Sequence, residues 1–182
     1  MKHLVLLLLP LLAISLPCTA GVDTQLVYDT EEHELSSDFL YYILSADRRT
    51  SGGLGVLHEN RPCHFFVVQA PGEAAVGMAV KFESYTASSD GAVRLSTNVT
   101  IGFDVITTCV ESMDWYVTNS SLLSSSEPHE HVAVGKDEDE DYIRSPAMVF
   151  RIEKYDGATE GYKLVSCAGD GPCKDLGLHT SG

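Results

Sequence analysis

Two histidines flank a glutamate at His129-Glu-His131, a residue set that can bind zinc. On a strand, however, positions i and i+2 supply only half of a tetrahedral site, and no third ligand is placed near them. The acidic run Asp137-Glu-Asp-Glu-Asp141 resembles the start of a calcium loop, but Tyr142 stands where the glycine is required and Met148 where the closing glutamate belongs. We therefore interpret both segments as solvated loops and predict no resident metal.

Sequence motifs for catalysis are missing. The chain has no GxSxG, HExxH, Walker or dinucleotide-type glycine pattern. Serine, histidine and aspartate are plentiful, but a catalytic triad is defined by geometry and not by abundance. Trp115 and the tyrosines of the predicted strands are most simply core residues. We therefore predict that the protein is not an enzyme and needs no cofactor.

The amino-terminal segment indicates export. An apolar run from Leu4 to Leu16 is followed by small residues up to Ala20, the pattern of a secretory signal peptide that is cut before Gly21. The run is too short to span a bilayer and no second one follows, so no membrane partner is expected. The predicted organisation is a signal peptide at 1–20 and one secreted domain at 21–182.

The cysteine count fits this compartment. Removing Cys18 with the signal peptide leaves Cys63, Cys109, Cys167 and Cys173. Four cysteines in an exported chain predict two disulfides, in any of three pairings. A structural zinc site is disfavoured because the cysteine spacings are not those of zinc ligands.

Charge excludes one class of partner. The net charge is −14, which argues against binding to nucleic acid or to an anionic membrane surface. Asn98-Val-Thr100 and Asn119-Ser-Ser121 are acceptor sequences for N-glycosylation, which we predict at Asn98 and Asn119.

Short alternating runs rich in Val, Ile, Tyr and Phe recur along the chain, and helical periodicity is nearly absent. We predict strands near 26–29, 41–45, 54–57, 64–69, 79–84, 92–96, 99–104, 114–118, 131–134, 148–154, 161–166 and 175–179. Many short strands at regular spacing predict an all-β barrel or sandwich. The polar segments 120–130 and 136–141 break the alternation and are predicted to be exposed loops.

An ordered series of motifs covers most of the predicted domain. It comprises Val27-Tyr-Asp-Thr30, Tyr41-Tyr-Ile-Leu44, Arg94-Leu-Ser-Thr97, Thr107-Thr-Cys109, Phe150-Arg-Ile-Glu-Lys-Tyr155 and Asp175-Leu-Gly177. The series resembles the plant Kunitz-type (soybean trypsin inhibitor) family, and within it the cereal α-amylase/subtilisin inhibitors. The resemblance implies a β-trefoil, a six-stranded barrel capped by three hairpins. It also implies the disulfide pairs Cys63–Cys109 and Cys167–Cys173.

The resemblance further implies a mechanism, in which a rigid exposed loop enters a serine protease as a substrate would. The loop falls at Tyr85, Thr86, Ala87, Ser88 and Ser89, with Ala87, or Thr86 as the rival, in the specificity pocket. No lysine or arginine lies in this stretch to meet the carboxylate of a trypsin pocket, so a subtilisin-like protease is the expected partner. On turn chemistry alone the same residues read as an ordinary surface loop.

Other implied features concern support and a second target. Ser37 stands where many family members have an asparagine that braces the loop. Ser96, Lys163 and Asp175 match positions that face α-amylase in the cereal inhibitors. Family members also continue past Leu178 to a strand that closes the barrel, and we expect this chain to lack that strand.

Two activities from different classes remain open at this stage. The first is protease inhibition by a secreted monomer, located outside the cell or, after the secretory pathway, in the vacuole or endosperm. The second is a non-inhibitory trefoil that serves as a storage or carbohydrate-binding protein.

Overall fold

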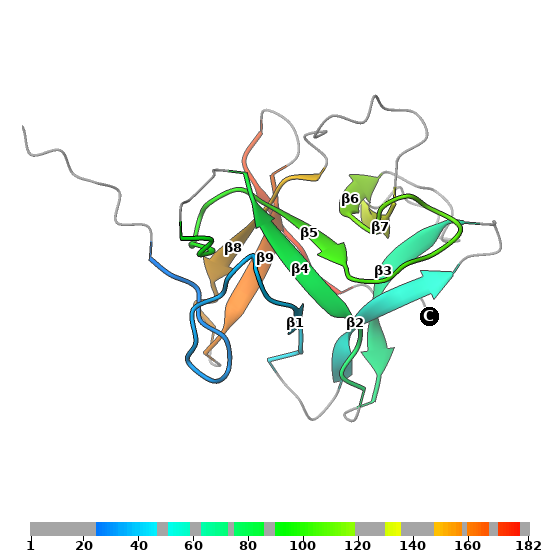
Figure 1. Cartoon of the computed structure of the whole chain (residues 1–182). Helices are drawn as coiled ribbons and strands as arrows, with labels where there is room; N and C mark the ends of the chain where they lie inside the picture. The colour runs from blue at the N-terminus through cyan, green and yellow to red at the C-terminus, as the bar shows by residue number, and fades with distance from the viewer. Residues whose placement is uncertain are drawn as a thin grey trace, which may run out of the picture.

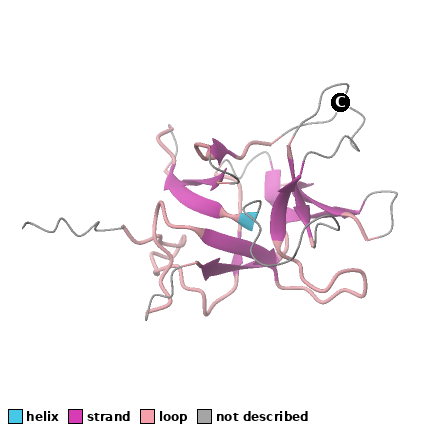
Figure 2. Ribbon diagram, turned by 90° about the horizontal axis from the view of Figure 1, so that it is seen from above, coloured by secondary structure: helices cyan, strands magenta, loops and turns pink. Residues whose placement is uncertain are grey.

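Ten β-strands make up the regular structure of the described residues. The computed structural model describes residues 25–46, 51–58, 63–72, 75–85, 90–118, 130–135, 148–157, 160–167 and 171–178. The strands are β1 (Tyr41–Tyr42), β2 (Ser51–His58), β3 (Phe65–Pro71), β4 (Ala79–Ser84), β5 (Val99–Phe103), β6 (Trp115–Thr118), β7 (His131–Val134), β8 (Phe150–Lys154), β9 (Tyr162–Ser166) and β10 (Lys174–Asp175). No α-helix occurs in these ranges, and only Met148 has 3₁₀ geometry (Figure 2). The all-β prediction is confirmed.

The strands form two antiparallel sheets (Figure 1). The larger has the order β1-β4-β5-β8-β9-β10, and the smaller has the order β2-β3-β7-β6. Within the described part of the chain, no helix is long and apolar enough to cross a membrane.

One hydrophobic core lies against both sheets. β4 shows how the alternation builds it: Val80 and Phe82 are buried, whereas Lys81 and Glu83 between and after them are exposed. Trp115 from β6 is buried, and its ring contacts those of Phe103 and Phe150 at centroid distances of 5.1 and 6.4 Å. These aromatic contacts connect the two sheets, because Phe103 and Phe150 belong to the larger one.

Two of the predicted strands are absent as such. Segments 26–29 and 92–96 make only isolated bridges, Leu26 with Arg94, Tyr28 with Glu34 and Ser36 with Ala92. The segment 92–96 does face the core, since Ala92, Val93 and Leu95 are buried. The ladder is too short to form a strand because turns interrupt it at 90 and again at 95–97.

β2 begins earlier than predicted, at Ser51 and not at 54. A Cβ added to Gly53 would lie 2.0 Å from the carbonyl oxygen of Val76, so the neighbouring backbone fits only against glycine here. A Cβ added to Gly52 would likewise lie 2.4 Å from the carbonyl oxygen of Ala75. These two glycines therefore lie inside the strand, at a place where another backbone segment of the same chain approaches closely.

The remaining boundaries differ from prediction by a few residues. β4 and β7 match it, while β1 and β10 are only two residues long, where five were predicted at 41–45 and 175–179. β10 and β1 lie at the two edges of the larger sheet. The predicted loop 136–141 and most of 120–130 lie outside the described residues.

The two disulfides have the pairing that the resemblance implied. Cys63 is bonded to Cys109, and Cys167 is bonded to Cys173. The first joins the connection between β2 and β3 to the segment between β5 and β6. The second closes the connection between β9 and β10.

Candidate functional site

The predicted inhibitory loop is flanked by described residues on both sides. Thr86, Ala87, Ser88 and Ser89 lie outside the described residues, whereas Tyr85 is described. We use the term loop stem for residues 84–85 on one side and 90–94 on the other. The geometry of the loop stem decides how firmly the loop is held.

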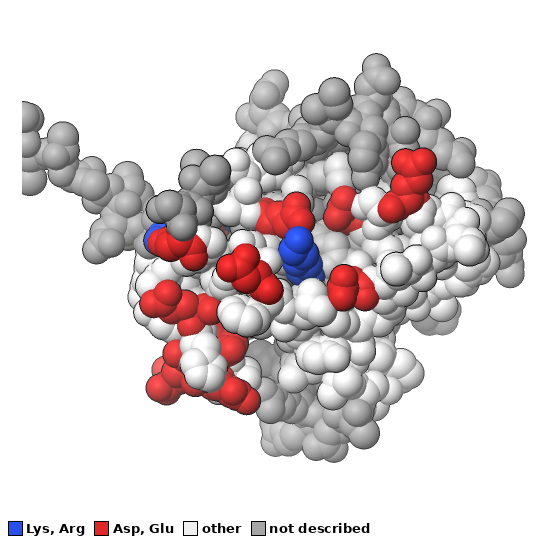
Figure 3. All heavy atoms as spheres, viewed as in Figure 1, with Lys and Arg blue, Asp and Glu red and all other residues white. Residues whose placement is uncertain are grey.

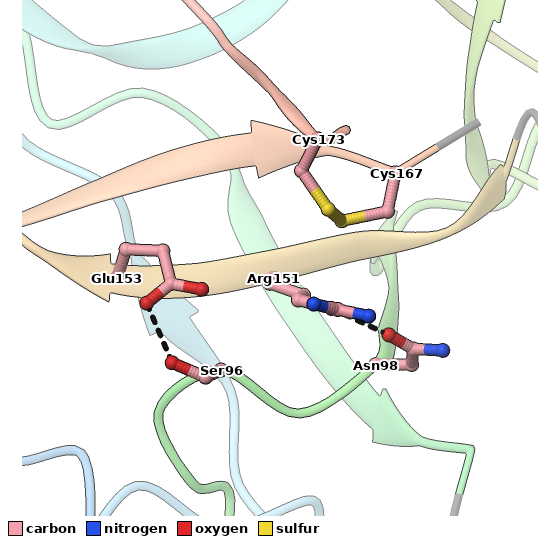
Figure 4. The surroundings of a disulfide bond; sticks show 6 residues. All are labelled: Ser96, Asn98, Arg151, Glu153, Cys167 and Cys173. Carbon is pink, nitrogen blue, oxygen red and sulfur yellow. Dashed lines mark hydrogen bonds between the residues drawn. A yellow bond between two sulfur atoms is a disulfide. The ribbon is translucent and has the colours of Figure 1, made fainter. Parts of the chain in front are cut away.

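On the amino-terminal side, β4 leads directly into the loop. Ser84 pairs with Val99 at the end of the β4–β5 ladder, and the Tyr85 amide donates to the carbonyl oxygen of Asn98 at 3.0 Å. The Asn98 side chain is held in turn, because Nε of Arg151 on β8 donates to its Oδ1 at 2.7 Å (Figure 4). This side of the loop stem is therefore attached to the middle of the larger sheet.

On the carboxyl-terminal side, the chain turns at Gly91, whose φ is +65°. Its carbonyl oxygen accepts a hydrogen bond of 2.9 Å from the Ser37 amide. Two residues later, the Val93 amide donates to Leu35 at 2.8 Å, while the Val93 carbonyl accepts from Val27 at 3.1 Å. The segment thus bonds to two amino-terminal segments, which also bond to each other through the Leu35 amide and the Val27 carbonyl oxygen.

Ser37, the predicted loop support, does lie beside the loop stem. Its contact is made by the main-chain amide, which any residue other than proline could supply. A Cβ added to Gly91 would lie 3.3 Å from Ser37 Oγ, so the hydroxyl faces the turn as well. Whether the hydroxyl braces the loop itself stays a prediction.

Asp90 and Arg94 form a contact that sequence reasoning missed. Arg94 Nη2 donates to Asp90 Oδ2 at 2.5 Å, and Arg94 Nη1 donates to Oδ1 at 3.3 Å. The Ala92 amide also donates to Asp90 Oδ1 at 3.1 Å, which makes an Asx turn over Gly91. The hydrogen bond that Arg94 donates to Asp90 is the main reason that the pKa of Arg94 is raised. The Asp-Gly pair was a readable turn signal, but its arginine partner was not.

The three predicted amylase-facing residues lie together on the β8–β9–β10 part of the larger sheet. Lys163 Nζ on β9 donates to both carboxylate oxygens of Asp175 on β10, at 2.9 Å each. Glu153 on β8 is the cross-strand neighbour of Lys163 and accepts a hydrogen bond of 2.7 Å from Ser96 Oγ. We call Ser96, Glu153, Lys163 and Asp175 the polar array. Glu153 was missed because its place depends on strand register.

Lys163 is the single cation of the polar array. Its pKa is raised, first by the hydrogen bond to Asp175 and further by the nearby charges of Asp175, Asp156 and Glu153, against a smaller opposing effect of desolvation. Lys163 therefore stays protonated over the physiological range, and its charge offsets those of the acidic side chains near it.

The segment 96–98 connects the loop stem to the polar array. Arg151 and Glu153, alternate residues of β8, reach Asn98 and Ser96 respectively (Figure 4). The Ser96 amide also donates to the carbonyl oxygen of Ile152 at 3.0 Å. Asn98, a predicted glycosylation site, binds Arg151 through its oxygen, whereas a glycan would be attached to its nitrogen. Asn119, the other such site, lies outside the described residues.

Acidic side chains dominate the face shown in Figure 3. On β4, the pKa of Lys81 is raised by its hydrogen bond to Glu83 and further by the charges of Glu83, Asp104 and Asp38. This face suits a partner with a positive rim and repels polyanions.

The metal readings receive no support within the described ranges. No group of three or more potential ligands is found there. His131 begins β7, where its ring packs edge-on against Phe66 at 6.0 Å, while His129 and the acidic run 137–141 lie outside the described residues.

A loop held at both ends on an all-β scaffold is the arrangement of proteins that present a fixed loop to a partner. The chain belongs to the Kunitz family of plant inhibitors, because the family profile described as "Trypsin and protease inhibitor" matches residues 27–182.

Curated relatives from cereals match over nearly the whole chain. The α-amylase/subtilisin inhibitor of rice (Oryza sativa) is 39% identical over 99% of this chain and 86% of its own length. That of barley (Hordeum vulgare) is 41% identical over 89% of this chain and 78% of its own length.

Solved structures agree with the fold. The rice bifunctional α-amylase/subtilisin inhibitor superposes with a TM-score of 0.69 at 36% identity, covering 87% of each chain. The soybean trypsin inhibitor has a TM-score of 0.66 over 87% of each chain at 22% identity, which bears on the fold alone. The β-trefoil that the resemblance implied is confirmed.

Proposed function

We propose that this protein is a secreted inhibitor of subtilisin-like serine proteases and acts through the loop Tyr85–Ser89. The observation that carries the proposal is the attachment of this loop at both ends, to Asn98 through Tyr85 and to Ser37 through Gly91. A loop whose flanking residues are held in place should lose less conformational entropy when a protease binds it, which favours affinity. The names of the cereal relatives, α-amylase/subtilisin inhibitors, support the same target class.

The loop sequence favours subtilisin over trypsin. Ala87, or Thr86 one position earlier, would enter the specificity pocket, and a small side chain suits the shallow pocket of subtilisin-like enzymes. Trypsin selects lysine or arginine, and neither occurs between Glu83 and Val93. The protein would act as a monomer with no cofactor and no catalysis of its own.

Export is part of the proposal. Two disulfides are typical of proteins that fold in an oxidising compartment. We propose that residues 1–20 are removed on the way to the extracellular space, the vacuole or the endosperm. The mass of the product secreted from a plant or yeast host should then correspond to a chain that starts at Gly21, with glycans detected as added mass on Asn98 or Asn119.

The direct test is a titration of subtilisin activity with this secreted, oxidised product. We expect stoichiometric inhibition by the wild type. An Ala87→Arg variant should lose potency against subtilisin and gain it against trypsin, because arginine meets the pocket carboxylate of trypsin. Thr86→Arg is the matched variant, and the position whose change shifts the target is the specificity residue.

A folded monomer that leaves subtilisin uninhibited would contradict the proposal. The storage or carbohydrate-binding alternative would then gain weight, and progressive digestion at many bonds would favour storage. An inhibitor should instead resist digestion or be cut at a single bond within the loop.

Inhibition of α-amylase is the second candidate function, and the polar array favours it. Ser96, Lys163 and Asp175, which match amylase-facing positions of the cereal inhibitors, form one exposed cluster with Glu153. A contact surface made of charged side chains should bind a complementary partner in a salt-dependent manner.

A single variant separates the two candidate functions. Lys163→Met should abolish binding to cereal α-amylase while leaving subtilisin inhibition unchanged, as measured by titration calorimetry and enzyme assays. Lys174→Met is the matched control, because Lys174 is paired with Glu130 and lies outside the polar array. Equal loss in both variants would exclude a specific role for Lys163.

A further inference from the structure

On the carboxyl-terminal side of the loop stem, side chains add hydrogen bonds to those made by the main chain. Arg94 donates to both carboxylate oxygens of Asp90 and also, through Nη1, to the carbonyl oxygen of Ala92 at 3.2 Å. Asp90 in turn accepts from the Ala92 amide. The guanidinium therefore binds to two consecutive parts of the turn that leads out of the loop.

The position of Arg94 explains how it can hold this turn. The residues on either side of it are fixed by main-chain bonds, since the Val93 amide donates to Leu35 and the Leu95 amide to Gln25, both at 2.8 Å. Its own carbonyl oxygen accepts from Thr97 Oγ1 at 2.7 Å. Arg94 thus extends from a fixed segment towards Asp90, the first described residue after the loop.

We propose that Asp90 and Arg94 form a clamp that positions the carboxyl-terminal half of the inhibitory loop. The inference rests on the proposed function and names two residues that would set inhibitory strength without touching the protease pocket. When the protease cuts the loop, its catalytic serine forms an ester with the residue before the cut, and the residue after the cut is released as a free amine. The clamp holds this amine close to the ester. That amine attacks the ester, re-forms the peptide bond and returns the proton to the serine oxygen of the protease.

The alternative is an ordinary surface ion pair. Such pairs contribute little, because solvent screens them and long side chains lose entropy on pairing. The Asp90–Arg94 pair differs in three ways. Its geometry is bidentate, Asp90 also accepts a hydrogen bond from the Ala92 amide, and the arginine side chain is only 27% exposed. The Lys174–Glu130 pair, which has one hydrogen bond and a more exposed cation, provides the comparison.

The test compares Arg94→Met, Arg94→Lys and the control Lys174→Gln in the secreted full-length product. Three quantities are measured: the inhibition constant for subtilisin, the fraction of cut chain by mass spectrometry, and the melting temperature. We expect Arg94→Met to inhibit about tenfold more weakly and to accumulate cut chain, with a melting temperature within a few degrees of wild type. Arg94→Lys should be intermediate, because an ammonium group cannot reproduce the two-pronged contact.

Several outcomes would overturn the clamp. One is wild-type inhibition by Arg94→Met, and another is an equal loss in Lys174→Gln. If Arg94→Met does not fold, Asp90→Asn replaces it, because asparagine keeps the Oδ1 acceptor for Ala92 and removes the charge. Wild-type inhibition by that variant would also overturn the clamp.

Failure of the proposed function gives a different result. If the wild type does not inhibit subtilisin, the rate of cutting between residues 85 and 90 by excess subtilisin becomes the measurement. The clamp then requires Arg94→Met to be cut about tenfold faster than both the wild type and Lys174→Gln. Equal rates would remove the clamp, whatever the protein inhibits.

Discussion

The loop stem and the polar array are built in different ways, although they share one sheet. Main-chain hydrogen bonds fix the loop stem, through Tyr85, Gly91 and Val93, and one bidentate ion pair adds to them. The members of the polar array contact one another through their side chains, which come from β8, β9, β10 and the segment 96–98. The first therefore imposes a backbone shape, whereas the second presents charges.

This difference separates two kinds of recognition. A fixed backbone gains affinity by avoiding entropy loss, and this contribution depends little on salt. Exposed charges guide association and select partners, and their effect weakens when salt screens them. A chain with both could bind two unlike enzymes at two places, with the segment 96–98 as the physical connection between them.

The largest expected effect comes from removing a core side chain on which both the loop stem and the polar array depend. Phe150 is fully buried in β8, pairs with Val99 and contacts the ring of Trp115. Phe150→Ala should lower the free energy of unfolding by about 3–5 kcal/mol, since it leaves a cavity in the core. Denaturant unfolding measures the loss, and both activities should fall together. Loss of only one activity would show that the two regions do not depend on the same core.

Removing the smaller disulfide should loosen the polar array and leave the loop stem unchanged. Cys167 and Cys173 are six residues apart, and loss of their bond should cost roughly 2.4 kcal/mol on the loop-entropy model. In a Cys167→Ala/Cys173→Ala variant we expect faster hydrogen exchange at Leu176, whose amide donates to Leu164 on β9. Hydrogen exchange at the Val93 amide should change only as much as the overall loss of stability requires. A selective change at Val93 would contradict the separation.

The loop stem can be strained at a single position. Gly91→Ala places a Cβ on a residue with φ +65°, which should cost about 1–2 kcal/mol and displace the turn after Asp90. Subtilisin inhibition should weaken more than amylase binding does. Gly171→Ala is the control, because an added Cβ there meets no atom within 4 Å. Equal weakening of both activities by Gly91→Ala would indicate a global effect.

The smallest expected effect is a pH dependence in the polar array. Because Asp175 raises the pKa of Lys163, the stabilisation is fully present below the ordinary value of 10.5 and is lost as the pH rises through the higher folded pKa. Unfolding of the wild type and of Lys163→Met should therefore differ slightly at pH 9 and converge in more alkaline solution. A difference that grows with pH would have the wrong sign. Subtilisin inhibition by the two proteins should stay equal at pH 9.

Much of the fold could be predicted because alternation and family motifs are local signals. β4 and β7 were placed correctly, and along β4 buried and exposed residues do alternate. The failures at 26–29 and 92–96 arose because the same alternation occurs in a segment that bonds at single positions only. The predicted start of β2 at 54 was late because Gly52 and Gly53, a residue type that is depleted in strands, lie inside the strand against a neighbouring backbone segment.

The candidate site was predictable only in part. Ser96, Lys163 and Asp175 came from the resemblance, and the structure adds Glu153, which becomes their neighbour only through the β8–β9 register. Asp90 and Arg94 are four residues apart, yet their pairing requires the turn at Gly91 that brings them together. Alternation in the sequence predicts which strand face is buried and where turns interrupt the strands, but it does not predict which residues become cross-strand partners.

The hydrogen bond between the Tyr28 amide and the Tyr162 hydroxyl bears on how the protein is made. It joins residues 134 positions apart, and the Asn98–Arg151 bond, 53 positions apart, fixes the other side of the loop stem. Contacts of this range form late, because much of the chain must be ordered to close them. Since synthesis runs from the amino terminus, we expect the loop of a growing chain to stay an ordinary protease substrate until β8 and β9 have left the ribosome. Resistance to digestion would then be acquired near the end of synthesis.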